Sequence, residues 1–515
     1  MNHADIKNMH ALKPLDYSDV GQAKVLKNFY ADRIWYTPAT NYLYYNGKKW
    51  VESETKVRSL VHELTEFQLQ DAIKFLQAAQ QSETDAEINK DSDGKKMAAN
   101  VVKAAKRYLK FVLDSRSTLR INATLTEAKP LFEAELSWLD RDGLLLNTPG
   151  GIIDLRTGIL EEHHFDRGCT KITNAELSDK GTDLFSDFLK TITCNNAELE
   201  NYLQLIAGMF AIGVVYEEKL VIAHGCGRNG KSTFFNLLAK VLGDYSGNLS
   251  AETLTANCRK NKSPEYAELR GKRLVIAAEL EEGTRLDTAI VKKLCSTDTI
   301  FAEKKYKDPF SFTPSHTIVL YTNHLPNVGT SDGGTWRRLI VIPFKAVITG
   351  DSDIRNYTEY LFENAGGAVL KWIVEGARKF IANNCRIDPP DVVKQEIEMY
   401  REANDWLNNY MDECCIIGEE YEQPSGPLYE HYRNHCKRYG EYPRKQSDFK
   451  KALENAGYKY IRTSQCRIFR GFKLKPEREE FQGPYVGLSK QSSVSGGDST
   501  EQNFQDDDDY TDVEF

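Results

Sequence analysis

The chain has 515 residues, of which 41% are hydrophobic and 28% charged, so it is long enough for several domains with ordinary globular cores. This composition excludes a fibrous or wholly disordered protein, and no apolar run approaches the length of a membrane helix; we therefore expect a cytoplasmic protein without a membrane partner. The net charge of −8 is concentrated in residues 491–515, which carry eight acids and no Lys or Arg.

Residues 1–175 are predicted to form an α+β domain. Short strand patterns near residues 34–38 and 42–50 include Asn46-Gly47, a strong hairpin-turn signal. Helical periodicity follows over residues 55–112, and polar stretches at 81–85 and 91–96 are predicted to interrupt it as loops. Apolar segments then alternate with turn formers over residues 144–158, which indicates a compact β-region.

The middle of the chain has the pattern of an α/β fold. Residues 176–215 have helical periodicity and are expected to form a collar before a core at 216–350. Continuous apolar runs separated by helical segments predict a mostly parallel sheet that is buried on both faces. The runs lie at residues 220–223, 273–278, 317–321 and 339–342.

The last third is predicted to hold three parts. Helices are expected over residues 351–425, interrupted at 388–391, followed by a smaller basic module at 426–480 and a disordered acidic tail at 481–515. Within the module, residues 428–475 carry thirteen Lys or Arg against four acids, an excess that suits a phosphate backbone. The tail is expected to keep the protein soluble; recruitment of a partner is the alternative.

A phosphate-binding loop follows the first apolar run and leads into an amphipathic helix. Its glycines permit backbone geometries in which successive N–H groups point at a polyphosphate. Lys231 is expected to reach the β- and γ-phosphates, and Ser232 to bind Mg²⁺. The sequence therefore predicts a nucleotide site whose loop residues are Gly225, Cys226, Gly227, Arg228, Asn229, Gly230, Lys231, Ser232 and Thr233.

Acidic residues follow the strand at 274–278, at the sheet edge where the phosphate loop is expected. One of them is predicted to orient the attacking water and another to hold the metal, directly or through water. The sequence does not divide those roles among Glu279, Glu281 and Glu282.

Three further polar residues complete the candidate site. Asn323 ends the next strand, where its amide can touch the γ-phosphate or the water. Arg337 and Arg338 precede the last strand, where a guanidinium can act as an arginine finger on the γ-phosphate of a neighbouring subunit.

A cationic cluster lies between the acids and Asn323. It has the composition of a hairpin tip that grips a nucleic-acid strand, and a solvated turn is the alternative. The cluster consists of Lys304, Lys305, Tyr306 and Lys307.

These motifs resemble the superfamily 3 helicases, particularly the phage and plasmid primase-helicase family that includes poxvirus-type primase-helicases. The similarity extends over residues 30–475 and is carried by the phosphate loop and by the segments 138–158, 274–283, 306–310, 322–326 and 335–344.

The resemblance implies an AAA+ ATPase core that uses ATP and Mg²⁺ and assembles into a ring, usually a hexamer, around DNA. Lys231 and Ser232 become the Walker A residues, Glu279 the Walker B acid and metal ligand, and Asn323 sensor 1. Arg338 becomes the trans-acting finger, with Arg337 as the alternate, and Lys305 or Lys307 becomes the DNA-gripping lysine.

The resemblance also suggests partners and a setting. Residues 428–475 are similar to a winged-helix module that binds duplex DNA, while the core would translocate on single-stranded DNA. No catalytic primase module is recognised upstream, so a primase or replication initiator is expected as a separate protein in a bacterial host cytoplasm. The alternative function is an origin-binding initiator that uses ATP as an assembly switch.

Overall fold

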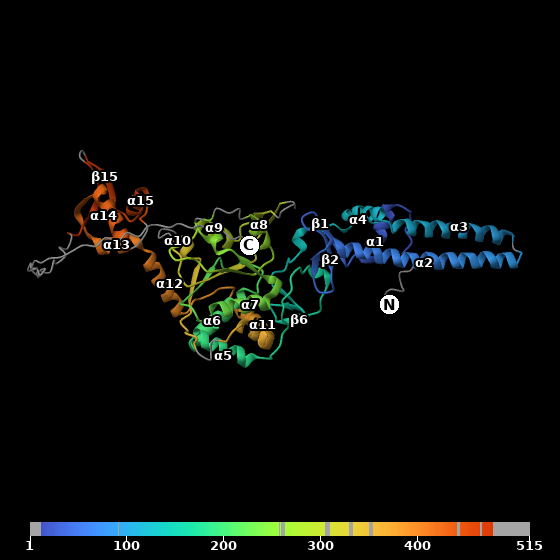
Figure 1. The fold of residues 1–515 in the computed structure, drawn as a ribbon, viewed down its shortest axis with the longest axis horizontal. Helices are drawn as coiled ribbons and strands as arrows, with labels where there is room; N and C mark the ends of the chain where they lie inside the picture. Colours follow the sequence, from blue (N-terminus) through green and yellow to red (C-terminus); the bar gives the residue numbers. More distant parts are fainter. Residues whose placement is uncertain are drawn as a thin grey trace, which may run out of the picture. The chain divides into compact units, whose positions relative to one another are not determined.

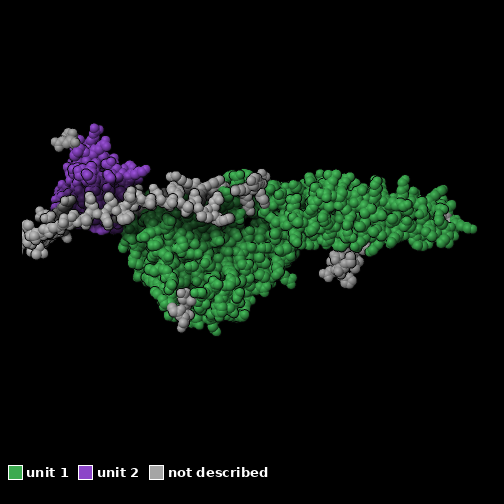
Figure 2. All heavy atoms as spheres, in the orientation of Figure 1, with its two compact units in different colours: residues 1–406 green, residues 407–515 purple. Residues whose placement is uncertain are grey.

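The computed structural model describes residues 12–90, 92–256, 258, 263–303, 309–328, 333–349, 354–439, 443–463 and 466–476. The chain divides into two compact units, residues 1–406 and residues 407–515 (Figure 2). Within the described residues, no helix is both long enough and apolar enough to cross a membrane.

The first unit begins with a helix and a small antiparallel sheet (Figure 1). Asn46 and Gly47 form the turn between the second and third strands, as predicted: the Asn46 side chain accepts from the backbone N–H groups of Lys48 and Lys49, and Gly47 has φ +93°. The elements are α1 (Asp19–Tyr30), β1 (Ile34–Thr37), β2 (Asn41–Tyr45) and β3 (Trp50–Glu52).

Two long helices follow and pack side by side, α2 (Glu54–Ile88) and α3 (Ser92–Ser115), before α4 (Thr118–Phe132) (Figure 1). The prediction of a loop at 81–85 is wrong, because α2 is continuous there. The hydroxyls of Ser82 and Thr84 donate to carbonyls one turn earlier, and Gln81 donates to Asp85, so the polar side chains are satisfied inside the helix. Most of the second predicted loop is also helical, since α3 begins at Ser92.

A second three-stranded antiparallel sheet confirms the predicted β-region at 144–158. Asn147 of β4 is fully buried, and its backbone N–H donates to the hydroxyl of Tyr245 in the following α/β core at 3.0 Å. The elements are the short 3₁₀ helices η2 (Leu136–Trp138) and η3 (Phe165–Arg167) and the strands β4 (Leu145–Thr148), β5 (Gly151–Asp154) and β6 (Ile159–Glu161).

A five-stranded parallel sheet, in the order β13-β7-β12-β9-β8, confirms the predicted α/β fold class. Its edge strand β8 was not predicted, because Ser-Gly-Asn-Leu is too polar to be recognised as a buried strand. The strands are β7 (Leu220–His224), β8 (Ser246–Leu249), β9 (Leu274–Ala278), β12 (Thr317–Thr322) and β13 (Leu339–Pro343); β10 (Ile300–Ala302) and β11 (Phe310–Phe312) form a separate antiparallel pair.

Helices cover both faces of this sheet (Figure 1). Alternate strand residues enter two different cores: Val221 and Val319 pack in one, and Leu220 and Ile318 in the other. The first face is covered by α5 (Thr182–Ile192), α6 (Ala197–Met209), α7 (Lys231–Leu242) and α11 (Tyr357–Ala382). The other is covered by α8 (Ser263–Glu268), α9 (Thr288–Cys295), α10 (Gly333–Trp336) and α12 (Asp391–Asn404), and η4 (Gly243–Tyr245) and η5 (Ala251–Leu254) flank β8.

The second unit is a small α+β body with an antiparallel sheet in the order β14-β16-β15. Phe449, Phe469 and Phe472 are buried in its core. Its elements are α13 (Trp406–Cys414), β14 (Cys415–Pro424), α14 (Ser425–Arg438), α15 (Gln446–Asn455), β15 (Lys459–Arg462) and β16 (Arg467–Leu474).

Helices α6 and α11 cross at two glycines. A Cβ atom at Gly208 would lie 2.1 Å from the carbonyl carbon of Gly376, and one at Gly376 would lie 2.1 Å from the carbonyl oxygen of Gln204. The close backbone approach seats α11 against the face that carries the phosphate-loop helix α7.

We predict that Gly208→Ala destabilises the first unit by about 1–3 kcal/mol, because the added methyl overlaps the backbone of α11. Gly366→Ala is the matched control in α11, since its nearest new contact is a flexible ring atom of Phe362 at 3.3 Å. Urea unfolding followed by circular dichroism measures both. Equal midpoints for the two variants would contradict the crossing as the cause.

Candidate nucleotide-binding site

The loop between β7 and α7 joins a strand to a helix and is closely packed at two of its glycines. A Cβ at Gly225 would lie 2.2 Å from the carbonyl oxygen of Phe344, and Gly230 has φ +81° with Ile192 2.4 Å from its absent Cβ. Asn229 braces the loop by donating to that same Phe344 carbonyl at 3.1 Å. Side chains larger than hydrogen are therefore excluded at both glycines for steric reasons.

Lys231 is the first residue of α7 and is buried, with 3% of its surface exposed. Its ammonium donates to the Gly225 carbonyl at 2.7 Å, to the Asn229 amide oxygen at 3.1 Å and to the Asn323 amide oxygen at 3.0 Å. All three acceptors are neutral. Burial lowers the pKa of Lys231, and the charge of Glu279 opposes that shift. A buried ammonium held only by neutral oxygens favours an anionic ligand.

One cavity of about 480 Å³ joins the loop to two of the predicted catalytic residues, Glu279 and Asn323. Of the three predicted acids only Glu279 lines it, since Glu281 and Glu282 do not; Asp187 of α5 is a further acid in the lining. From the loop, the lining residues are Gly227, Arg228, Asn229, Gly230, Lys231, Ser232 and Thr233; Gly225 and Cys226 lie outside the lining.

Glu279 has an unusual backbone. It follows β9 with φ +56°, in the left-handed region, and its N–H donates to the Tyr321 carbonyl at 3.0 Å. A non-glycine residue in this region costs about 1–3 kcal/mol where the surroundings impose it, and such residues gather at functional sites. The conformation turns the chain out of the sheet directly after β9, and the carboxylate is exposed.

The opposite wall of the cavity is largely apolar and was not predicted from the sequence. Leu184 and Phe188 come from α5, while Ile348, Ile354 and Tyr357 come from the segments before α11 and its first turn. In the sequence these residues belong to helical patterns or, in the case of Ile348, to no motif, so nothing linked them to the phosphate loop.

Arg337 and Arg338 have different environments. Arg338 is buried; it forms an ion pair with Glu218 and donates to the Gly334 carbonyl at 2.8 Å. Arg337 has 70% of its side chain exposed and lies 3.9 Å from the same carboxylate. Neither lines the cavity. Of the two, only Arg337 has a largely exposed side chain.

Helix α12 holds the loop that follows Asn323. The Tyr400 hydroxyl donates to the Pro326 carbonyl, and the Asn404 side chain accepts from the Val328 N–H at 2.7 Å. The predicted DNA-gripping residues Lys304, Lys305, Tyr306 and Lys307 lie outside the described residues.

Two family models match the chain. Residues 23–194 match the model described as "D5 N terminal like". Residues 223–338, which contain the phosphate loop, Glu279 and Asn323, match a "Family of unknown function (DUF5906)".

Viral proteins are among the similar sequences. A putative helicase of Acanthamoeba polyphaga mimivirus is 29% identical over 324 residues, which cover 60% of this chain and 32% of that protein. A putative helicase of Frog virus 3 (isolate Goorha) is 26% identical over 37% of this chain and 21% of that protein. A putative primase of African swine fever virus (isolate Pig/Kenya/KEN-50/1950) is 24% identical over 54% of this chain and 32% of that protein.

The chain thus spans about a third or less of these three relatives. Among solved structures, the apo C-terminal region of NrS-1 aligns over 58% of this chain and 77% of that chain at 12% identity and a TM-score of 0.36, too low to inform the fold. The family models and the viral relatives confirm the resemblance to primase-helicases that the motifs predicted.

We predict that Arg338→Ala lowers the free energy of unfolding by about 2 kcal/mol, because it leaves Glu218 without its buried partner. Arg337→Ala should change it by less than about 0.5 kcal/mol, as is usual for exposed side chains. Thermal and urea unfolding of the two variants provide the comparison. Equal stability losses would show that the buried pair contributes nothing.

Proposed function

We propose that this chain is an ATP-dependent DNA helicase of the superfamily 3 type, acting in the replication of a virus, phage, plasmid or other mobile element. The observation that carries the proposal is the contact between Lys231 and Asn323 in a cavity that Glu279 also lines. A loop cation, an acid and a polar amide at the ends of neighbouring parallel strands are the parts that hydrolysis of a nucleoside triphosphate requires. Primase activity is not part of the proposal.

ATP is proposed to lie along the cavity, with its phosphates against the loop and its base against the apolar wall. Lys231 would exchange its neutral acceptors for β- and γ-phosphate oxygens, and the loop N–H groups would bind the remaining oxygens. Phe188 and Tyr357 supply aromatic surface for the base. Mg²⁺, held by Ser232 and Glu279, would neutralise charge that develops on the phosphates.

Glu279 is proposed to orient the attacking water as well, and Asn323 to position the γ-phosphate. The only cations among the described residues that line the cavity are Arg228 and Lys231. A further positive charge is therefore expected from a neighbouring subunit, as in a ring. We assign that finger to Arg337 rather than to Arg338, because Arg338 is held by Glu218.

The core is proposed to be of the AAA+ type, because β12, which leads to Asn323, lies between the loop strand β7 and β9. A hexamer around single-stranded DNA is the proposed assembly, with Lys304–Lys307 as the gripping residues. Residues 428–475 are proposed to bind duplex DNA as a winged helix; α14, α15 and the β15–β16 hairpin form a helix-helix-wing arrangement that supports this. Residues 1–175, 176–215, 216–350, 351–425, 426–480 and 481–515 are the proposed domains.

An origin-binding initiator is the second candidate function. The observation that favours it is that residues 428–475, which carry the basic excess, lie in a unit that is compact by itself. Tight duplex binding together with negligible ATP turnover, with and without single-stranded DNA, would support this alternative over the helicase.

We predict that Lys231→Ala reduces ATP turnover and strand displacement at a model fork to background, because the γ-phosphate loses its charge-assisted contact. Lys180→Ala, an exposed lysine of the same unit, is the control and should keep both rates. An unchanged displacement rate in the Lys231 variant would exclude the helicase assignment.

If the nucleotide site is shared between subunits, two inactive variants should complement each other when they are mixed. Arg337→Ala alone should lose ATP turnover in the assembled state, and mixing it with Lys231→Ala subunits should restore part of the rate, because each hybrid interface can combine an intact loop with an intact finger. Arg338→Ala should not be complemented in this way. Absence of complementation for both arginines would argue against a site shared between subunits.

A further inference from the structure

A second cleft in the first unit lies where the N-terminal sheets meet the α/β core. It measures about 250 Å³ and is separate from the nucleotide cavity, with no lining residue in common. Four cations line it, and each comes from a segment between regular elements or at the end of one: Lys49, Lys171, Arg270 and Lys272.

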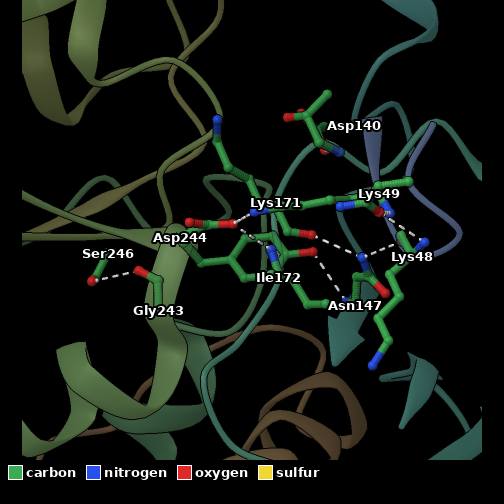
Figure 3. Close-up of polar contacts among 12 residues, drawn as sticks. Lys48, Lys49, Asp140, Asn147, Lys171, Ile172, Gly243, Asp244 and Ser246 are labelled. Atoms are coloured by element: carbon green, nitrogen blue, oxygen red, sulfur yellow. Dashed lines mark hydrogen bonds and ion pairs between the residues drawn. The ribbon is translucent and has the colours of Figure 1, made fainter. Parts of the chain in front are cut away.

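Asp244 lines the cleft and engages two of these cations, and Figure 3 shows its contact with Lys49. Its carboxylate pairs with Lys49 and accepts from the Ile172 N–H at 3.2 Å, and its carbonyl accepts from the Lys272 ammonium at 2.9 Å. Asn147 extends the network by donating to the carbonyls of Lys48 and Lys171 (Figure 3). These contacts hold the β2–β3 turn against the end of the phosphate-loop helix α7.

The other two cations of the cleft are Lys171 and Arg270. Within the part of the chain that the structure describes, neither the Lys171 ammonium nor the Arg270 guanidinium makes a hydrogen bond or an ion pair. Lys171 lies beside the backbone next to Arg270, since a Cβ at Gly271 would be 3.2 Å from the Lys171 Cε. Both are only partly exposed, so water compensates them incompletely.

The pKa values of two cations in the cleft are shifted by burial. Burial lowers the pKa of Arg270, against the opposing charges of Asp140 and Glu52. Burial also lowers the pKa of Lys272, and the nearby ammonium of Lys171 lowers it further. A bound anion would relieve both effects.

The carboxylates of the cleft limit what that anion can be. Asp140, Asp244, Glu52 and Glu268 also line it, so its formal charge is balanced. Asp140 already accepts from the N–H of Thr170 at 2.7 Å, and Asp244 is paired. A free triphosphate, with several negative charges, would be repelled by these acids. A phosphodiester carries one charge per nucleotide, which the charges of Lys171 and Arg270 can compensate.

We propose that this cleft binds a backbone phosphate of single-stranded DNA, with Lys171 and Arg270 as its ligands. The planar guanidinium of Arg270 can donate two hydrogen bonds to one phosphate, and Lys171 adds a point charge. Phe310, whose ring lies 5.9 Å from the Arg270 guanidinium, offers a surface on which the adjoining base can stack.

The position of Phe310 supports DNA as the source of the phosphate. It begins β11, which pairs with β10, and the proposed DNA-gripping residues lie between these two strands in the sequence, so the two proposed DNA contacts are neighbours along the chain. The inference thus rests on the proposed DNA function. It adds a DNA contact on the N-terminal side of the core. Asp244, which follows α7, lines the same cleft.

The test measures binding of a labelled DNA single strand to the full chain by fluorescence anisotropy over a series of salt concentrations. Arg270→Gln and Lys171→Gln should each weaken binding about tenfold, the usual effect of one charge-assisted hydrogen bond. Each should also reduce the slope of log affinity against log salt by about 0.7, the value for one phosphate on a single strand. Arg270→Lys should keep the slope, because it keeps the charge.

Lys24→Gln, an exposed lysine of α1, is the matched control and should bind like the unaltered chain. DNA-independent ATP turnover should be normal in all variants, which separates loss of the cleft from loss of the fold. Slopes of the Arg270 and Lys171 variants equal to that of the control would overturn the cleft alone. Failure of the unaltered chain to bind single-stranded DNA would overturn the proposed function together with the cleft.

Discussion

The central constraint in this molecule is the buried ammonium of Lys231, held at the carboxyl edge of a parallel sheet by three neutral oxygens. Two of the acceptors, Gly225 and Asn229, belong to the phosphate loop, and the third, Asn323, directly follows β12. The buried ammonium therefore requires that the phosphate loop and the end of β12 stay together. The glycines of the loop, the brace from Asn229 to Phe344 and the contact with Asn323 all serve that requirement. In the proposed function, phosphate oxygens would replace these neutral acceptors of a preorganised positive charge at little reorganisation cost.

Helices α7 and α12 connect the surroundings of Lys231 to other parts of the chain. Helix α7 begins at Lys231, and Asp244 lies just beyond its last turn. At the rise of an α-helix, α7 is about 18 Å long. Asp244 is the residue that ties the N-terminal β2–β3 turn to the core. Helix α12 supports the other side by bonding to Pro326 and Val328 beyond Asn323, and it leads in sequence to the second unit. Asp244 and α12 thus link the candidate nucleotide site to segments that are proposed to contact DNA.

Local chemistry explains which predictions followed from the sequence. Continuous apolar runs identified β7, β9, β12 and β13 because strands buried on both faces need them. The edge strand β8 lacks that signal because its first three residues are polar or small and are not buried, whereas the other edge strand, β13, is apolar and fully buried. The stretch at 81–85 contains no Gly or Pro, and its side chains bond within the helix, so packing on α3 overrides its polarity.

The sequence by itself determined the phosphate loop, the acid and the amide, because glycine geometry and residues at strand ends follow from neighbours along the chain. It also determined the resemblance to the D5-type proteins. Only the tertiary structure decided which residues face the cavity: Glu279 rather than Glu281 or Glu282, and the apolar wall from α5 and α11. It likewise separated a buried Arg338 from an exposed Arg337, and it brought Lys171 beside Arg270. Burial and charge compensation depend on segments far apart in the sequence, and no local pattern encodes them.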